Sequence, residues 1–177
     1  DVVAVGGSDT HRASTETPPP GPLDQALGFP TTWVWSASPD GLLDALEGGQ
    51  TIVSDPATQL DVFAWNTTQA VGPGSTIEGP ATVRVMATVK HSDLQLEVLG
   101  LRPGDCVVDT RTQDGEVPIV EPEVLLRLPL DSMASVERDF SLQEPMHVIV
   151  RVWPAEDRVG VVDGISVASP IQILRID

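Results

Sequence analysis

An aspartate and a histidine two positions apart, Asp9 and His11, are the residues whose types and spacing best suit chemistry. They follow a short apolar run, residues 2–5, and two glycines. In extended backbone, residues i and i+2 project to the same side, so the two side chains can point at one place just past the end of a strand. A carboxylate and an imidazole are both good ligands for Zn, Mn or Fe. The spacing therefore predicts a divalent-metal site, of which this pair supplies only a part.

The elements that must position this pair alternate between strand and helix. Residues 2–5 are typical of a fully buried strand in a parallel sheet, and residues 31–35 and 51–53 have the composition of further short strands. A helix is predicted between the last two, with Ser38 as its N-cap and Pro39 at its first position. Two glycines end it. Its apolar stripe consists of Leu42, Leu43, Ala45 and Leu46.

From about residue 58 the pattern changes to alternation with a period of two, which is typical of half-buried strands. Seven or eight short strands with no helix pattern predict an antiparallel β-sandwich of immunoglobulin-like kind over residues 58–177, folding as a domain of its own. The alternating runs lie at residues 60–64, 83–89, 94–98, 124–130, 148–152 and 171–176. The predicted inward-facing residues include Val83, Val85, Val89, Leu96, Val98, Leu126, Leu128, Val148, Val150 and Val152.

The composition excludes several classes of partner. The chain has 177 residues, of which 41% are hydrophobic, so it can bury a real core. Its 26 acidic and 10 basic residues give a net charge of −16, which argues against binding to nucleic acid or to an anionic membrane surface. No run approaches the about 18 apolar residues of a membrane helix. Cys106 is the single cysteine, so no intramolecular disulfide can form, and we expect it to be a small buried strand residue.

Four segments taken together resemble the closing part of a polymerase-and-histidinol-phosphatase (PHP) domain, in the branch that includes carbaryl-hydrolase-like metallohydrolases. The family pattern runs Gly-Ser-Asp-x-His, then Gly-x-Pro-x-Thr-x-Val, a short helix, and Gly-Arg-Thr-x-Val-Ser. The matching segments are residues 7–12 (Gly-Ser-Asp-Thr-His-Arg), 27–34 (Leu-Gly-Phe-Pro-Thr-Thr-Trp-Val), 41–46 (Gly-Leu-Leu-Asp-Ala-Leu) and 49–55 (Gly-Gln-Thr-Ile-Val-Ser-Asp). The chain departs from the pattern where Gln50 replaces the usual arginine and where Asp55 is followed directly by Pro56.

The resemblance implies that residues 1–57 are the C-terminal end of a distorted (β/α)7 barrel that carries a metal cluster, with the sandwich after it. It implies a metal-dependent hydrolase of a small phosphoester or related ester. Asp9 and His11 would be metal ligands, and Ser8 and Thr10 would orient them. Family members often end in an Asn-Pro-Ile-like element, which residues 168–173 resemble.

The His-x-His pair that begins the family's ligand set is absent from this chain. We therefore expect the chain to be the C-terminal part of a longer polypeptide, to need the upstream part of the barrel as its partner, and to be inactive alone. The resemblance favours an exported over a cytoplasmic location. His91 and His147 are expected to be surface or strand-end residues rather than ligands.

A second hypothesis is that the sandwich is a non-catalytic binding module for carbohydrate or protein. Trp65 and Trp153 would then be its binding platforms, unless both pack in the core or at the domain junction. A third hypothesis, structural calcium, has little support because the acidic residues near turns lack the spacing of an EF-hand loop. Those residues are Asp109, Asp114, Glu116, Glu121 and Glu123.

Overall fold

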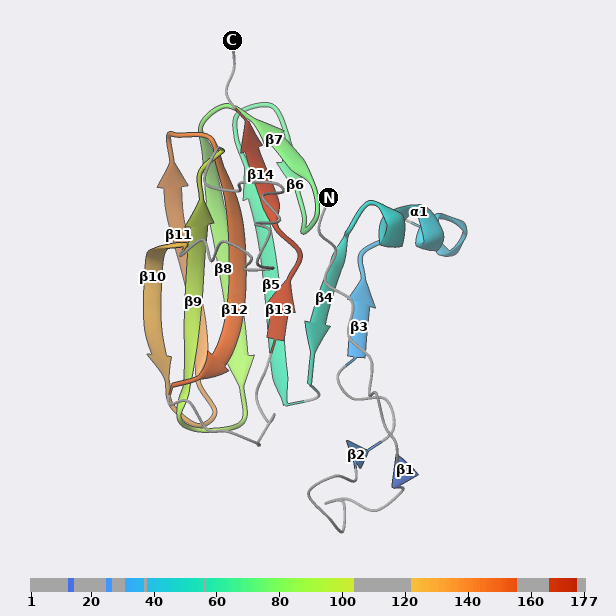
Figure 1. Cartoon of the computed structure of the whole chain (residues 1–177), viewed down its shortest axis with the longest axis vertical. Helices are drawn as coiled ribbons and strands as arrows, with labels where there is room; N and C mark the ends of the chain where they lie inside the picture. The colour runs from blue at the N-terminus through green and yellow to red at the C-terminus, as the bar shows by residue number, and fades with distance from the viewer. Residues whose placement is uncertain are drawn as a thin grey trace, which may run out of the picture.

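The computed structural model describes residues 13–14, 25–26, 31–36, 38–55, 57–103, 122–155 and 166–174. This part of the chain is mainly β, in two largely antiparallel sheets that face each other in a β-sandwich-like arrangement (Figure 1). Two short strands, β1 (Ala13–Ser14) and β2 (Gln25–Ala26), pair with each other in parallel, apart from both sheets. The strand predicted at residues 2–5 lies outside the described residues, as does Cys106.

The larger sheet has the strand order β10-β9-β12-β13-β4-β3. Strand β14 also pairs with β12, and β7 pairs with β14 in parallel. The bounds of these strands are β3 (Thr31–Val34), β4 (Thr51–Ser54), β7 (Thr76–Glu78), β9 (Leu94–Leu101), β10 (Glu123–Leu130), β12 (Met146–Pro154), β13 (Ser166–Ala168) and β14 (Ile171–Leu174).

The smaller sheet has the order β11-β8-β5-β6 and is antiparallel throughout. Each of its three long strands has one face toward the other sheet and one face outward, as the period-two pattern requires. The bounds are β5 (Thr58–Trp65), β6 (Ala70–Val71), β8 (Ala81–Val89) and β11 (Ser135–Leu142).

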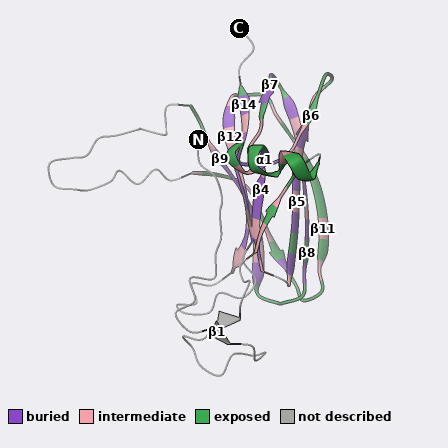
Figure 2. Cartoon of the chain, turned by 90° about the vertical axis from the view of Figure 1, so that its right-hand side faces the viewer, coloured by how far each residue is buried: buried purple, intermediate pink, exposed green. Residues whose placement is uncertain are grey.

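The core lies between the two sheets and consists almost entirely of aliphatic side chains, because the chain has few aromatic residues. Most of the predicted inward-facing residues are confirmed, and Figure 2 shows the long strands carrying the buried positions. Two of them, Leu126 and Leu128 on β10, are only half-buried, although they pack against the core. The fully buried ones are Val83, Val85, Val89, Leu96, Val98, Val148, Val150 and Val152.

The predicted helix is confirmed as a 3-10 turn, η1 (Pro39–Gly41), that continues into α1 (Leu42–Glu47). The Ser38 side chain accepts a hydrogen bond from the Gly41 backbone N–H at 3.3 Å, which is the predicted capping role. Of the predicted apolar stripe, only Ala45 is buried, and Leu42 and Leu43 lie exposed on the surface. Figure 2 shows this helix as one of the most exposed elements of the fold.

Strands β3 and β4, which belong to the segment that resembles a PHP domain, extend the larger sheet. Strand β4 pairs with β13, so that Val53 lies opposite Val167, and β3 pairs with the far side of β4. The side chains of Thr51 and Ser169 add a buried hydrogen bond of 2.7 Å. The predicted division at residues 57 and 58 falls between β4 and β5.

The carboxylate of Glu97 lies on the outer face of the larger sheet between two arginines. Register places Arg127 of β10 and Arg151 of β12 directly opposite it on either side. The two arginines bind one carboxylate oxygen each, and both closest approaches are 2.7 Å. Glu97 is only 1% exposed. Burial alone would raise the pKa of Glu97, but the hydrogen bonds and charges of Arg151 and Arg127 outweigh it and hold the pKa below its ordinary value of 4.5.

We predict that Glu97→Gln lowers the free energy of unfolding at pH 7 by about 2 kcal/mol, because two arginines lose their shared anion. A group whose pKa is lower in the folded state stabilises the fold above its unfolded pKa, and this contribution is lost as the pH falls through the folded pKa. In urea titrations, the difference between wild type and Glu97→Gln should narrow below about pH 4.5. An equal difference at pH 7 and at pH 3 would contradict this account.

Candidate functional site

The residues predicted to bind metal, Asp9 and His11, lie outside the described residues, as do Ser8 and Thr10. Their assignment therefore remains a prediction from the sequence. Within the described residues, no group of three or more His, Cys, Asp or Glu side chains is placed to hold a metal ion. His91 is exposed after β8, and His147 is half-buried on β12. Of the acidic residues considered for calcium, only Glu123 is described, and it lies 3.4 Å from Arg102.

The outer face of the smaller sheet forms a polar and aromatic surface built by strand register. Across β11, β8 and β5, Asp139 lies opposite Arg84, which lies opposite Phe63. The next row places Ser141 opposite Thr82, which lies opposite Trp65. These residues face outward because they alternate with the valines and alanines of the core.

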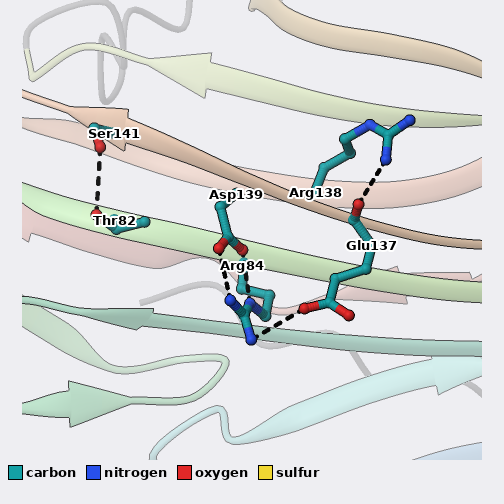
Figure 3. A network of polar contacts seen from close by, with 6 residues as sticks. All are labelled: Thr82, Arg84, Glu137, Arg138, Asp139 and Ser141. Carbon is teal, nitrogen blue, oxygen red and sulfur yellow. Dashed lines mark hydrogen bonds and ion pairs between the residues drawn. The ribbon is translucent and has the colours of Figure 1, made fainter.

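Arg84 is the centre of this face (Figure 3). Its guanidinium forms two bonds of 2.6 Å with the Asp139 carboxylate and a third contact of 3.0 Å with Glu137. The hydrogen bond from Arg84 holds the pKa of Asp139 below its ordinary value. The guanidinium also lies 5.2 Å from the centre of the Trp65 ring and 5.8 Å from that of Phe63. The Arg84 guanidinium thus lies against both aromatic rings, and the carboxylates of Asp139 and Glu137 neutralise its charge.

A hollow of about 1010 Å³ opens at the end of this face, beside Trp65. Its floor includes Thr82 and Ser141, whose hydroxyls lie 3.3 Å apart. One wall is the turn between β5 and β6, and the other includes β7 and the residue after β11, Gln143. Besides Trp65, the lining consists mainly of hydroxyl and amide side chains, with Glu78 as its carboxylate.

Asn66 holds the first of these walls in shape. Its side-chain oxygen accepts hydrogen bonds from the backbone N–H groups of Thr68 at 2.9 Å and Gln69 at 3.0 Å. Its side-chain amide donates to the backbone carbonyl of Glu78 at 2.8 Å, which ties the turn to β7. The hollow is therefore bounded by hydrogen-bonded backbone on both sides.

A second hollow of about 620 Å³ lies between β3 and β4 on one side and β5 on the other. Trp33 and Trp35 border it and are 60% and 51% exposed. Thr58 also lines this hollow, and its hydroxyl is buried without a hydrogen-bond partner among the described residues. Both tryptophans belong to the segment that resembles a PHP domain, and so do the exposed Leu42 and Leu43.

The two tryptophans named as binding platforms occupy different surroundings. Trp65 is half-buried and borders the larger hollow, whereas Trp153 lies on the outer face of the other sheet, with the Arg151 guanidinium 5.3 Å from its ring centre. Neither tryptophan belongs to the buried core. The contact between Trp65 and Arg84 joins two strands and could not be found from sequence, because it depends on register. Arg151 and Trp153, by contrast, lie two residues apart on the same strand.

Comparisons with known proteins leave the class of this chain open. No model of a protein family matches the sequence, and no curated protein matches it. Two solved structures share a loose similarity of fold. The PmoD soluble domain from Methylocystis sp. ATCC 49242 (Rockwell) has a TM-score of 0.38 and 11% identity, and covers 64% of this chain and 90% of that one. The C-terminal domain of wzt also has a TM-score of 0.38, with 7% identity, and covers 84% of this chain and 79% of that one. Similarity at this level carries no functional argument.

The described part of the chain has α1, with six residues, as its α-helix, and no helix there is long and apolar enough to cross a membrane.

Proposed function

We propose that the chain is the C-terminal part of a metal-dependent hydrolase of the PHP type, acting on a phosphoester or a related ester. The order and spacing of the segments at residues 7–12, 27–34, 41–46 and 49–55 carry the proposal. Strand, helix and strand form in the expected order at the last three matched positions, as β3, η1 with α1, and β4. The order alone supports the proposal, because β3 and β4 pair antiparallel, unlike the parallel neighbouring strands of a (β/α) barrel. The (β/α)7 barrel end and the immunoglobulin-like topology belong to the same proposal.

Asp9 and His11 form a donor set that suits Zn, Mn or Fe, since it joins one carboxylate to one imidazole. Two protein ligands do not hold a metal cluster, so the remaining ligands must come from an upstream part of the polypeptide. Bound metal supplies a hydroxide nucleophile at neutral pH by lowering the pKa of coordinated water to about 7. In this proposal Asp9 and His11 would hold the metal, and Ser8 and Thr10 would orient these two ligands.

The exposed apolar side chains near β3 support a partner surface in the same polypeptide. Trp33, Trp35 and Leu43 are each more than half exposed, and Leu42 is nearly so. They gather on β3, α1 and the turn between them. Exposed apolar patches of this kind mark interaction surfaces in soluble proteins. We propose that the upstream part of the barrel covers them.

We predict that the purified 177-residue chain has no metal-dependent hydrolase activity, because it lacks most of the ligands. The measurement is hydrolysis of bis-p-nitrophenyl phosphate with Zn²⁺, Mn²⁺ or Fe²⁺ added. The matched comparison is the polypeptide extended by its upstream coding sequence, where we expect a His-x-His motif and metal-dependent turnover. Turnover by the 177-residue chain, or an upstream sequence without that motif, would contradict the proposal.

A second candidate function is a non-catalytic binding module formed by the sandwich. One observation favours it, namely the large hollow beside Trp65 with its polar lining. Ligand sites are usually concave, with an apolar surface and a few polar groups that fix orientation. This function does not depend on the metal residues, and the two candidates can hold in the same polypeptide.

A further inference from the structure

We propose that the hollow beside Trp65 binds a neutral saccharide. The inference rests on the second candidate function and names the ligand class for it. The hollow lies at the end of the outer face of the smaller sheet and is also lined by β7 of the larger sheet; its described lining contains no residue of β3 or α1.

The lining has the chemistry of a surface for a hydroxyl-rich ligand. Hydroxyl and amide side chains both donate and accept hydrogen bonds, as sugar hydroxyls do. Several of them have no hydrogen-bond partner within the described part of the protein and remain available. These are Thr67, Gln69, Thr76 and Gln143. The lining thus offers several unpaired donors and acceptors around one opening.

Trp65 supplies the apolar contact that such a ligand needs. An indole combines a flat apolar body with one N–H donor, so it can pack against the C–H face of a sugar ring. Arg84 lies 5.2 Å from its ring centre and Phe63 lies 5.6 Å away, and both hold the ring in place. The turn fastened by Asn66 is also ordered before any ligand arrives. Preorganised contacts reduce the entropy lost on binding.

The charges in and around the hollow disfavour an anionic ligand. Among the described residues that line the hollow, Glu78 carries a carboxylate and none is a lysine, arginine or histidine. Arg84 lies next to the hollow, but Asp139 and Glu137 compensate its charge. The whole chain carries a net charge of −16. A neutral polyol is therefore favoured over phosphorylated or acidic sugars and over acidic peptides.

The test is a glycan array followed by NMR titration of the ¹⁵N-labelled chain with neutral tetrasaccharides that bind on the array. We expect saturable shifts of the backbone amides of residues 66–69 and 82, with a Kd of about 1 mM or lower. Trp65→Ala should weaken binding at least about tenfold, and Gln143→Ala, which removes an exposed side chain without a partner, should weaken it about fivefold.

Trp153→Ala is the matched control, because Trp153 is also a strand tryptophan stacked under an arginine, on the opposite sheet. It should leave the saccharide affinity unchanged. Three results would overturn the proposal: no neutral glycan binds, the shifts map to the surroundings of Trp153, or tetragalacturonic acid binds more tightly than every neutral glycan. If a protein bound to the same face and no glycan did, the saccharide proposal would be wrong. The second candidate function, a binding module, would still be supported.

Discussion

Replacing Gly74 by alanine should lower the free energy of unfolding by about 3 kcal/mol or more, enough to remove a large share of the stability of a typical domain. Gly74 has a φ of +74°, a conformation that side chains disfavour. A Cβ at this position would lie 2.1 Å from the backbone oxygen of Gly49, which follows α1. The contact joins two backbones, so no side chain can rotate to relieve it. Urea unfolding followed by tryptophan fluorescence measures the effect.

Gly72→Ala is the control for this prediction, because it makes the same substitution two residues earlier. Its added Cβ would meet the ring of Trp35 at 3.4 Å, which is ordinary van der Waals contact. We expect a change within about 0.5 kcal/mol. Equal losses of stability in Gly72→Ala and Gly74→Ala would contradict this account. They would mean that the close packing of Gly74 against the residues after α1 does not hold β3, α1 and β4 to the rest of the fold.

The core of this protein could be predicted because alternation of apolar and polar residues leaves a direct trace in the sequence. Strands β5, β8, β9 and β12 were expected from that pattern and are confirmed. The cap at Ser38 was expected because its residue type, followed by proline, is specific to helix starts. Both signals are local, and both act within a few residues.

Strand β11 was missed because a charge interrupts its pattern. Val136, Phe140 and Leu142 face the core side, but Arg138 occupies the position between them. An arginine can be accommodated there because β11 is at the edge of its sheet, and its guanidinium turns to the backbone carbonyl of Glu137. Inward charges on edge strands also discourage pairing with other chains.

Long-range pairing accounts for most of what the sequence did not reveal. Strand β13 has three residues and joins β4, more than one hundred residues earlier in the chain. No local pattern indicates that partner. The same holds for the hollow beside Trp65, whose lining comes from β5, β7, β8 and the end of β11. Trp65 was expected as a platform and residues 66–69 follow it directly, but only the fold brings Thr76, Ser141 and Gln143 to the same place.

The central claim is that Asp9 and His11 bind a catalytic metal. Substitution of either residue should therefore lower hydrolase activity more than any other single substitution in the chain. In the polypeptide that includes the upstream barrel, Asp9→Ala and His11→Ala should each lower phosphodiester hydrolysis by a factor of about 100 or more and reduce bound metal in parallel. Each variant removes one metal ligand, so the affinity for the metal and the hydrolase activity should fall together. His147→Ala is the matched control, since it removes a half-buried strand histidine from the sandwich.

The most direct measurement is the metal content of these four proteins, determined by mass spectrometry after gel filtration, beside their rates with bis-p-nitrophenyl phosphate. The account predicts metal and activity in the wild type and in His147→Ala, and a parallel loss of both in Asp9→Ala and His11→Ala. Full metal content and an unchanged rate in both of the latter variants would contradict it.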